Sequence, residues 1–523
     1  MSKITKTRLF ELLSARHQGN PYTKLADIPS PDSFKDIKKA TTRIKSAILN
    51  NEPITIVGDY DVDGVVSTSI MLDFFEKINY KVKHIIPNRF EHGYGLSEKI
   101  VDLIDSGLVI TVDNGISAVN ASQKLNEKGV DLIITDHHTV GEKLPTALAI
   151  VNPKQDDCTF EFKDICGAQV AWYLCAAIKK EMNLKVNMGD FLDLLCIAII
   201  ADMMPMTKLN YTMVKQGLVR LKNSNRESLK KLNEIMQKSN VASDDIGFMI
   251  APKLNSAGRM DDASLALDFL LAKSSFEAAN TLQMLEELNN YRKTLQEQIF
   301  NQAKAVSNEN DHAIVVWGED WHEGVIGIVA SKICNSFKKP AIVFSVNNGI
   351  AKGSARANAN INLHTIISKA SHLLLGFGGH KNAAGLSLKE ENLEEFRKII
   401  NDQLINCEED LYINPKILGE LDVSSVDLEF LEILDSFEPY GLENLKPIFN
   451  ISNANLIKYD LLGKEKNHLK LTLNINGFVF EAIKFNDNNT QLPESLNLIV
   501  SVGKNEFRGK TNPQFLVEEI VNL

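Results

Sequence analysis

Three apolar runs in this chain end directly in acidic side chains, which limits the folds that it can adopt. The runs ITIVGDYD, LVITVDNG and DLIITDHH pass from aliphatic and β-branched residues into Asp59, Asp113 and Asp136. Uninterrupted apolar runs are typical of parallel strands that are buried on both faces. Because open parallel sheets bind ligands at the carboxyl edge of their strands, we expect these acids to gather at one edge.

Further potential ligands stand next to these acids in the sequence. They are Asp61 and Asp63 in GDYDVDG, His137 and His138 after Asp136, and Asp202 at the end of the apolar helix FLDLLCIAIIAD. Taken alone, Asp113-Asn114-Gly115 is typical of a turn, and Asp202 is typical of a solvated helix cap. The four segments together favour a metal centre, because adjacent buried titratable groups are costly to desolvate without a partner.

The types of ligand narrow the choice of metal. Carboxylate and imidazole groups suit Mn²⁺ and, less well, Mg²⁺, whereas a thiolate-rich set would indicate zinc or an iron–sulfur cluster. The first half of GDYDVDG also resembles an EF-hand calcium loop. We exclude that interpretation because a strand precedes the motif and the later acidic ligand is missing.

The chain is predicted to contain several domains, since 523 residues exceed what one core usually organises. Residues 1–50 form a helical segment, and strands alternate with helices over residues 51–272, as in an α/β domain with a doubly wound, mostly parallel sheet. Residues 273–311 show helical periodicity without Gly or Pro, which predicts one long connecting helix. Residues 312–408 return to an α/β pattern in a smaller domain, where LHTIISKASHLLLGF is expected to be one helix.

The last segment, residues 409–523, alternates polar and apolar positions and is predicted to form strands. Asn476-Gly477, between HLKLTLNI and FVFEAIKF, indicates a tight hairpin turn. Short strands with such turns fit a small β-barrel, and the OB-fold is the small barrel that also binds single-stranded nucleic acid.

Five further runs carry a resemblance to a known family. They are PNRFEHGYGLS at 87–97, LNSAGRM at 254–260, WHEGVIGIVA at 321–330, GSARAN at 353–358 and GFGGHKNAAG at 376–385. Together with the acidic and histidine motifs, they resemble the DHH phosphoesterase superfamily and, more closely, the bacterial RecJ family of single-strand-specific exonucleases. The resemblance runs from about residue 50 to the C-terminus, and it implies a DHH domain at 51–272, a DHHA1 domain at 312–408 and an OB-fold-like nucleic-acid-binding domain at 409–523.

The resemblance implies a metal-dependent exodeoxyribonuclease. Such an enzyme degrades single-stranded DNA from 5′ to 3′, releases 5′-mononucleotides and acts in DNA repair and recombination. Two Mn²⁺ or Mg²⁺ ions would be held by Asp59, Asp61, Asp63, Asp113, His137, His138 and Asp202. The ions would activate a water molecule and clamp the attacking and leaving oxygens, so no Ser or Cys nucleophile is required.

The resemblance also implies roles for residues beyond the metal ligands. The catalytic set would be Asp136, His138 and His380, with Asp136 orienting a ligand histidine. The substrate-binding set would be Arg89, Tyr94, Arg259, Ser354, Arg356, Gly378, Gly379 and His380. Tyr94 would stack on the terminal nucleotide, and His380 would face the scissile phosphate from a glycine-rich loop that covers the metal centre.

Composition sets weaker limits on location and partners. The net charge of −10 does not favour nucleic-acid binding by itself, but it includes the acids of the predicted metal site, which two divalent ions would largely neutralise. The N-terminus lacks the apolar region of a signal peptide, no apolar run is long enough to span a membrane, and the six cysteines form no CxxC pair. We therefore expect a cytoplasmic monomer that binds single-stranded DNA, with a single-stranded-DNA-binding protein and a helicase as partners by resemblance.

Three other functions are compatible with the same motifs. A DHH-family phosphodiesterase acting on cyclic dinucleotides or short oligoribonucleotides, and an inorganic pyrophosphatase, would share the metal centre but would need neither the barrel nor the long helix. A catalytically inactive DNA-binding scaffold is disfavoured because every predicted ligand is present.

Overall fold

The computed structural model describes residues 3–357, 361–379, 381–405, 416–463, 466–507 and 510–521. The chain forms two compact units. The first contains the chain up to Ile85, Gly95–Ala251 and the chain from Lys416 onward, and the second contains Ile86–Tyr94 and the chain that follows from Pro252. Among the described residues, no helix combines the length and the apolar character that crossing a membrane requires.

The first unit is built around a five-stranded sheet with the order β2-β1-β3-β4-β5, in which every neighbouring pair is parallel. The strands are β1 (Ile54–Val57), β2 (Lys83–Ile85), β3 (Leu108–Val112), β4 (Asp131–Thr135) and β5 (Ala149–Val151). The strand order reverses between β1 and β3, and doubly wound sheets of this order bind ligands at the carboxyl ends of the strands at that point. The predicted fold class is confirmed for this unit.

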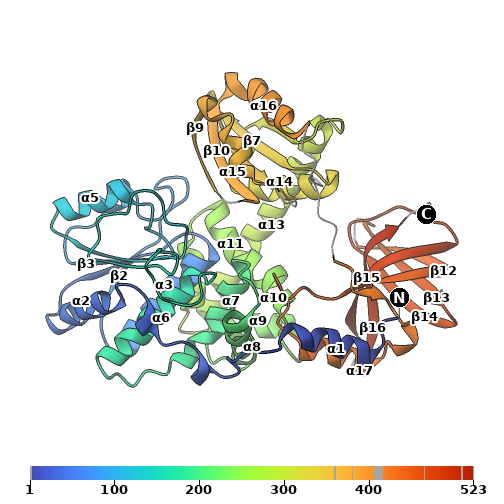
Figure 1. The fold of residues 1–523 in the computed structure, drawn as a ribbon, viewed down its shortest axis with the longest axis horizontal. Coiled ribbons are helices and arrows are strands. Elements are labelled where there is room, and N and C mark those ends of the chain that lie inside the picture. Colours follow the sequence, from blue (N-terminus) through green and yellow to red (C-terminus); the bar gives the residue numbers. More distant parts are fainter. Residues whose placement is uncertain are drawn as a thin grey trace. The chain divides into compact units, whose positions relative to one another are not determined.

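Helices cover both faces of this sheet. The helices of the first unit that precede residue 251 are α1 (Lys6–Arg16), α2 (Ile37–Leu49), α3 (Val62–Lys77), α4 (Glu98–Val101), α5 (Val119–Glu127), α6 (Gly167–Glu181), α7 (Leu192–Ala201), α8 (Lys208–Lys222), α9 (Glu227–Met236) and α10 (Ser243–Asp245), of which α1 packs against the C-terminal segment instead of the sheet. Figure 1 shows α5 on one side of the sheet and α2 on the other. The side chains of α4 and α5 form one apolar cluster with Val57 of β1, Val109 of β3 and the alternate residues Leu132 and Ile134 of β4, as the period of two in a strand requires.

The second unit contains the long helix and a mixed sheet with the order β6-β7-β8-β10-β9. Its elements are α11 (Ala251–Met260), α12 (Ser264–Leu270), α13 (Ser275–Val306), β6 (Ile314–Glu319), α14 (Glu323–Phe337), β7 (Ala341–Asn347), β8 (Ile350–Arg356), α15 (Leu363–Ser368), β9 (Leu374–Gly379), β10 (Ala383–Lys389) and α16 (Leu393–Ile405). Ser274 caps α13 by accepting a hydrogen bond from the backbone N–H of Glu277. This 32-residue helix confirms that the segment is one long helix, as predicted.

One helix prediction in the second unit was wrong. The helix expected through Phe377 ends at Ser368, and Leu374–Gly379 forms the edge strand β9, which pairs with β10. The spacing of its apolar residues is compatible with a helix, but a short apolar run is also compatible with a strand. Hydrogen bonding to the neighbouring strand decides between the two conformations.

The C-terminal segment forms a closed five-stranded barrel within the first unit. Its strands are β12 (Ile448–Leu462), β13 (His468–Ile475), β14 (Phe478–Lys484), β15 (Ser495–Phe507) and β16 (Lys510–Val521), and the pairing of β12 with β15 closes it. The short strand β11 (Gly419–Glu420) extends β12, and α17 (Leu428–Ser436) packs against α1. Asn476 and Gly477 both have positive φ in the turn between β13 and β14, as a tight hairpin requires. The predicted OB-like barrel is confirmed.

Candidate metal centre

The GDYDVDG motif is the turn from β1 into α3. Asp61 is the N-cap of α3, and its Oδ1 accepts a hydrogen bond of 3.0 Å from the backbone N–H of Gly64. Asp59 is buried, and a Cβ on Gly64 would lie 2.6 Å from the Asp59 Cβ. Only glycine lets the first turn of the helix approach Asp59 this closely, so the motif packs three carboxylates into one turn.

Asp63 is fixed by a second helix. Both of its carboxylate oxygens accept hydrogen bonds from the first turn of α6, Oδ2 from the Gly167 N–H at 2.6 Å and Oδ1 from the Ala168 N–H at 2.9 Å. The positive end of the helix dipole favours the ionised carboxylate there. Gly167 is also close to Asp113, because a Cβ at this position would lie 2.3 Å from Asp113 Oδ1.

Asp113 follows β3 with a left-handed backbone (φ 62°), and the next residue holds the strand ends together. The side-chain NH2 group of the buried Asn114 shares its two hydrogens among three backbone carbonyls, those of Val57 at the end of β1, of Gly58 and of Val112 in β3. Its Oδ1 accepts a hydrogen bond from the backbone N–H of Leu96. Asn114 therefore fixes the gap between β1 and β3, where the strand order reverses.

The Asp136-His137-His138 triplet follows β4. Asp136 Oδ1 accepts hydrogen bonds from the backbone N–H groups of both histidines and lies 2.7 Å from His138 Nδ1, while Oδ2 accepts from the N–H of Ile116. Asp136 is thus occupied by the protein itself and orients His138. A proton on His138 Nδ1 leaves Nε2 as the nitrogen with a lone pair for a metal ion.

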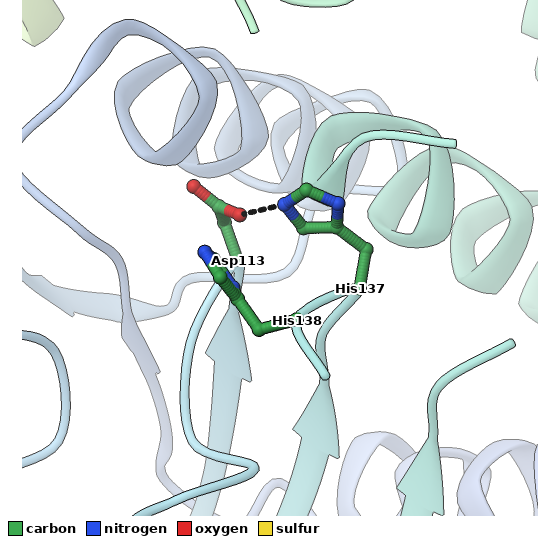
Figure 2. Close-up of side chains that lie close together, drawn as sticks. All are labelled: Asp113, His137 and His138. Carbon is green, nitrogen blue, oxygen red and sulfur yellow. Dashed lines mark ion pairs between the residues drawn. The ribbon is translucent and has the colours of Figure 1, made fainter. Parts of the chain in front are cut away.

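His137 lies at the centre of the acidic cluster. Its Nε2 is 3.2 Å from Asp113 Oδ1, 3.6 Å from Asp202 Oδ2 and 3.7 Å from Asp63 Oδ2. Figure 2 shows the Asp113 carboxylate and the His137 ring facing each other from the ends of neighbouring strands. Asp202, the C-cap of α7, reaches the same point from a helix.

Three groups of potential metal ligands overlap in this centre. Within each group, one atom from each member lies within 4.8 Å of the others, and the groups are Asp59–Asp61–Asp113, Asp113–His137–His138 and Asp63–His137–Asp202. Asp113 and His137 each belong to two groups. The structure therefore brings all the predicted metal ligands together, and it leaves only Asp136 out of the three groups.

Burial and the close approach of these charged groups shift their pKa values. Burial and the charge of Asp61 raise the pKa of Asp63 to about 6, and burial raises the pKa values of Asp113 and Asp202 well above their usual range. Burial lowers the pKa of His137 to about 3. Burial opposes protonation of His138, but its hydrogen bond to Asp136 and the negative charges of Asp136, Asp202 and Asp61 together outweigh burial and raise the pKa of His138 to about 9.

The donor set fits hard divalent cations. Carboxylate oxygens and neutral imidazole nitrogens bind Mn²⁺ and Mg²⁺, and a cation removes the repulsion that raises these carboxyl pKa values. Asp202 Oδ2 is buried and accepts no hydrogen bond from any residue that the structure describes, which leaves it available as a ligand. The two ligands that are shared between groups favour two neighbouring ions over one.

The predicted substrate-binding residues lie in the second unit. Arg89 Nε donates to the carbonyl of Gly258 at 3.1 Å, and Arg259 Nη1 donates to the carbonyl of Gly324 at 3.2 Å. On β8, Arg356 Nη1 donates to Ser354 Oγ at 2.9 Å.

These four residues surround the start of one helix. A Cβ on Gly327 of α14 would lie 3.0 Å from Arg356 Nη2 and 3.1 Å from Ser354 Oγ, one turn after the Gly324 carbonyl that Arg259 contacts. The structure therefore gathers Arg89, Arg259, Ser354 and Arg356 around the first turns of α14.

The structure says less about the other predicted substrate-binding residues. Tyr94 is 43% exposed, and Gly378 and Gly379 lie at the end of the edge strand β9. His380 lies outside the described residues.

Sequence reasoning missed three residues that shape these sites. Asn114 was assigned only to a turn, although an Asn placed directly after a strand-terminal Asp is a signal for a side chain that bonds backbone groups. Gly167 gave no signal, because glycine at the first position of a helix has no special meaning until its neighbours are known. His322 stands in the motif WHEGVIGIVA, where it caps α14 by accepting a hydrogen bond from the N–H of Gly324, and its ring contacts Phe90 edge-on.

Comparisons with known proteins agree with this architecture. Residues 53–199 match the family model described as "DHH family, N-terminal domain", residues 310–406 match the DHHA1 domain, and residues 417–519 match the RecJ OB domain. The fold and the ligand set thus define a DHH-type phosphoesterase.

Whole-chain comparisons narrow the class further. The single-stranded-DNA-specific exonuclease RecJ of Haemophilus influenzae is 33% identical over 98% of this chain and 96% of its own length. RecJ of Bacillus subtilis is 36% identical over 95% of this chain, which spans 65% of that relative. The crystal structure of RecJ from Thermus thermophilus in complex with Mn²⁺ superposes with a TM-score of 0.84 at 27% identity, covering 99% of this chain and 76% of that one. The chain belongs to the RecJ family of single-stranded-DNA-specific exonucleases.

Proposed function

We propose that this protein degrades single-stranded DNA from the 5′ end and releases 5′-mononucleotides by two-metal-ion phosphodiester hydrolysis, in DNA repair and recombination. The observation that carries the proposal is the overlap of three ligand groups through Asp113 and His137. A site for one isolated ion would not need two residues that each serve two groups.

We propose Mn²⁺ or Mg²⁺ as the metal, since the structures of RecJ from Thermus thermophilus contain one or the other ion. When bound, two such ions supply an activated water molecule and neutralise charge on the reacting phosphate. The ligands proposed are Asp59, Asp61, Asp63, Asp113, His137, His138 and Asp202.

The protein's own contribution is to fix these groups. Asp113 would be able to serve both metal positions, because its carboxylate is within reach of both Asp59 and His137. Asp136 holds the His138 ring through the 2.7 Å contact to Nδ1, so the proton on that ring stays on the side away from the metal centre. We propose Asp136 as a positioning residue and His138, together with His380, as catalytic residues.

The phosphates of the DNA are proposed to bind in the second unit. Arg356 is largely buried, and its guanidinium pairs with no carboxylate among the residues that the structure describes. A buried guanidinium without an acidic partner is costly unless an anion occupies the site. The start of α14 adds backbone N–H groups and a positive helix end, which also favour phosphate.

We propose that Arg89, Arg259, Ser354 and Arg356 hold phosphates. Tyr94, with 43% of its surface exposed, is proposed to stack on the terminal nucleotide, and Gly378, Gly379 and His380 are proposed to complete the substrate site.

The barrel is proposed to contribute to strand binding through its shape more than its charge. Several lysines on its strands are paired with acids, including Lys470 with Glu481 and Lys458 with Asp460. Paired lysines attract phosphate weakly, so the proposed electrostatic contacts come mainly from the second unit.

The proposal is tested with purified protein, Mn²⁺ and a panel of substrates. The panel contains a single strand labelled at the 5′ end, the same strand labelled at the 3′ end, a duplex, a cyclic dinucleotide and pyrophosphate. We expect labelled mononucleotide to appear at once from the 5′-labelled strand, and only late from the 3′-labelled strand. Hydrolysis of the cyclic dinucleotide or of pyrophosphate in preference to DNA would contradict the proposal.

The site assignment is tested with variants in the same assay. D113A and H137A are expected to lose activity with metal in excess, because each removes a ligand that serves two groups. D131N is the matched control, since Asp131 starts β4 at the edge of the sheet away from the metal centre. Full activity in D113A or H137A, or loss of activity in D131N, would refute the assignment.

Cellular context follows from the proposed substrate. We propose that the protein acts in the cytoplasm as a monomer, and that a helicase and a single-stranded-DNA-binding protein supply and hold the strand. A single strand must be generated from duplex DNA before an exonuclease of this specificity can act. Binding of a purified single-stranded-DNA-binding protein, measured by fluorescence anisotropy, would test the partnership.

A further inference from the structure

Two helices that carry proposed metal ligands also carry a buried aspartate at their opposite ends. Helix α3 has Asp63 in its first turn and Asp73 ten residues later, and α7 has Asp193 near its start, nine residues before Asp202. At 1.5 Å per residue, each pair is separated by about 14–15 Å along its helix. The two helices therefore have ligands at one end and a second pair of acids at the other.

The helices run antiparallel and are joined at both ends. At one end, Asp63 Oδ2 and Asp202 Oδ2 lie 3.7 and 3.6 Å from His137 Nε2. At the other end, Asp73 and Asp193 both contact Arg226, which precedes α9. The separation of the ligands at the first end thus depends on how the helices are aligned at the second.

Arg226 makes a specific and largely buried contact with both helices. Its Nη2 donates to Asp73 Oδ2 at 2.7 Å, and its Nε lies 3.2 and 3.1 Å from the two oxygens of Asp193. The guanidinium is largely buried, and the two aspartates are 8% and 5% exposed. Ser224 Oγ completes the contact with a 2.6 Å hydrogen bond to Asp193 Oδ2.

This buried ion pair is better explained by a role in fixing the positions of the helices than by a gain in net stability. A buried ion pair rarely stabilises a fold more than apolar side chains of the same volume, and its best-attested use is to fix register. The faces of α3 and α7 that pack between the two ends are largely apolar, and apolar packing is not directional. A planar guanidinium that contacts two carboxylates is directional, so it can fix one axial alignment of the helices.

We propose that Arg226 is a positioning residue for the metal centre, which holds α3 and α7 in the register that directs Asp63 and Asp202 toward His137. This inference rests on the proposed metal site. It assigns to Arg226, Asp73 and Asp193 an effect on metal affinity, although they lie two to three helical turns from the ligands.

The test compares two matched arginine networks. The variant R226M/D73N/D193N removes the charges together, so that no carboxylate is left buried and unpaired. Its control is R43M/E52Q/D131N, because Arg43 also bridges two acids, its side chain is 17% exposed like that of Arg226, and Asp131 starts β4 at the other edge of the sheet. Mn²⁺ binding is measured by titration calorimetry, and urea unfolding is measured on the same samples without metal.

We expect the Arg226 network variant to bind Mn²⁺ about tenfold more weakly, in the range seen when outer residues of metal sites are changed, while the control binds like the parent chain. In the nuclease assay, the Mn²⁺ concentration for half-maximal activity should rise by the same factor. The KM for DNA and the rate at saturating Mn²⁺ should stay near the parent values. R226K, which keeps the charge but not the planar fork, should show an intermediate loss.

Unchanged Mn²⁺ affinity in the Arg226 network variant, or an equal loss in the Arg43 control, would overturn the inference. Failure of the parent chain to bind Mn²⁺ would instead overturn the proposed metal site, so the two failures are distinguishable. If the triple variant does not fold, D73L alone removes the acceptor on α3, and parent-like Mn²⁺ affinity in D73L overturns the inference in the same way.

Discussion

Replacing Gly167 with alanine is the sharpest single test of the metal-centre geometry. Gly167 is the first residue of α6, where alanine would ordinarily be the better helix former by about 1 kcal/mol. Here the added Cβ would lie 2.3 Å from Asp113 Oδ1 and 2.4 Å from the Asp113 Cβ, whereas ordinary contacts begin near 3.4 Å. Either the Asp113 carboxylate or the start of α6 must therefore move by roughly 1 Å.

That displacement has different consequences for stability and for activity. Overpacking costs about 1–3 kcal/mol, which the helix propensity of alanine partly offsets, so we expect G167A to be destabilised by only about 0–2 kcal/mol. Both possible movements disturb a proposed ligand, because the Gly167 N–H also holds Asp63. Misplacement of a reacting group by 1 Å costs roughly 100-fold, so activity at a fixed Mn²⁺ concentration should fall by about that factor.

The assay follows exonuclease rate, Mn²⁺ affinity and urea unfolding for the same preparation. Gly247 provides the control, because it is also helical and a Cβ there meets nothing within 4 Å. G247A should keep the activity and the Mn²⁺ affinity of the parent chain. Parent-like activity and metal affinity in G167A would show that Asp113 is not held in the position described.

Three further predictions address other parts of the molecule. The pKa of Asp63 is about 6 in the metal-free protein against 3.8 ordinarily, so its protonated form contributes stability that is full below about pH 4 and is lost as the pH rises through 6. Because Mn²⁺ binds the ionised form, calorimetry should show a larger Mn²⁺-induced rise in Tm at pH 8 than at pH 5, and equal rises would contradict the assignment. Asn114→Ala removes the two N–H groups that three backbone carbonyls share and should cost about 2–4 kcal/mol in urea unfolding, whereas a loss below 1 kcal/mol would argue against its role. Gly477→Ala forces alanine into φ +89° and should destabilise the barrel by about 1–2 kcal/mol. The loss should appear as faster amide exchange in β13 and β14 but not in β1 and β3. Unchanged exchange would show that the hairpin has another turn geometry.

Much of the fold could be predicted because its signals are local. The three apolar runs that form β1, β3 and β4, the absence of Gly and Pro from α13 and the Asn476-Gly477 turn each determine a conformation within a few residues. The run after Ser368 shows where this fails, because a short apolar segment satisfies both a helical and a strand pattern. Pairing with β10, which lies later in the chain, decides between them.

The candidate ligands could be named from the sequence for a similar reason. A charged residue at the end of a buried strand is unusual, and several such residues at one sheet edge indicate a shared partner. Their pairing could not be predicted, because the distances around His137 depend on how α6 and α7 approach the sheet. Asn114 and Gly167 likewise gained their meaning only from neighbours that are distant in the sequence.

The sequence by itself determined that the acids and histidines which follow β1, β3 and β4 meet, since parallel strands with polar ends leave them only one edge of the sheet to share. Only the tertiary structure decided how close they come and what holds them there. Contacts such as those of Gly167 with Asp113 and of Arg226 with Asp73 and Asp193 join segments far apart in the chain, and no local pattern encodes a distance between two helices.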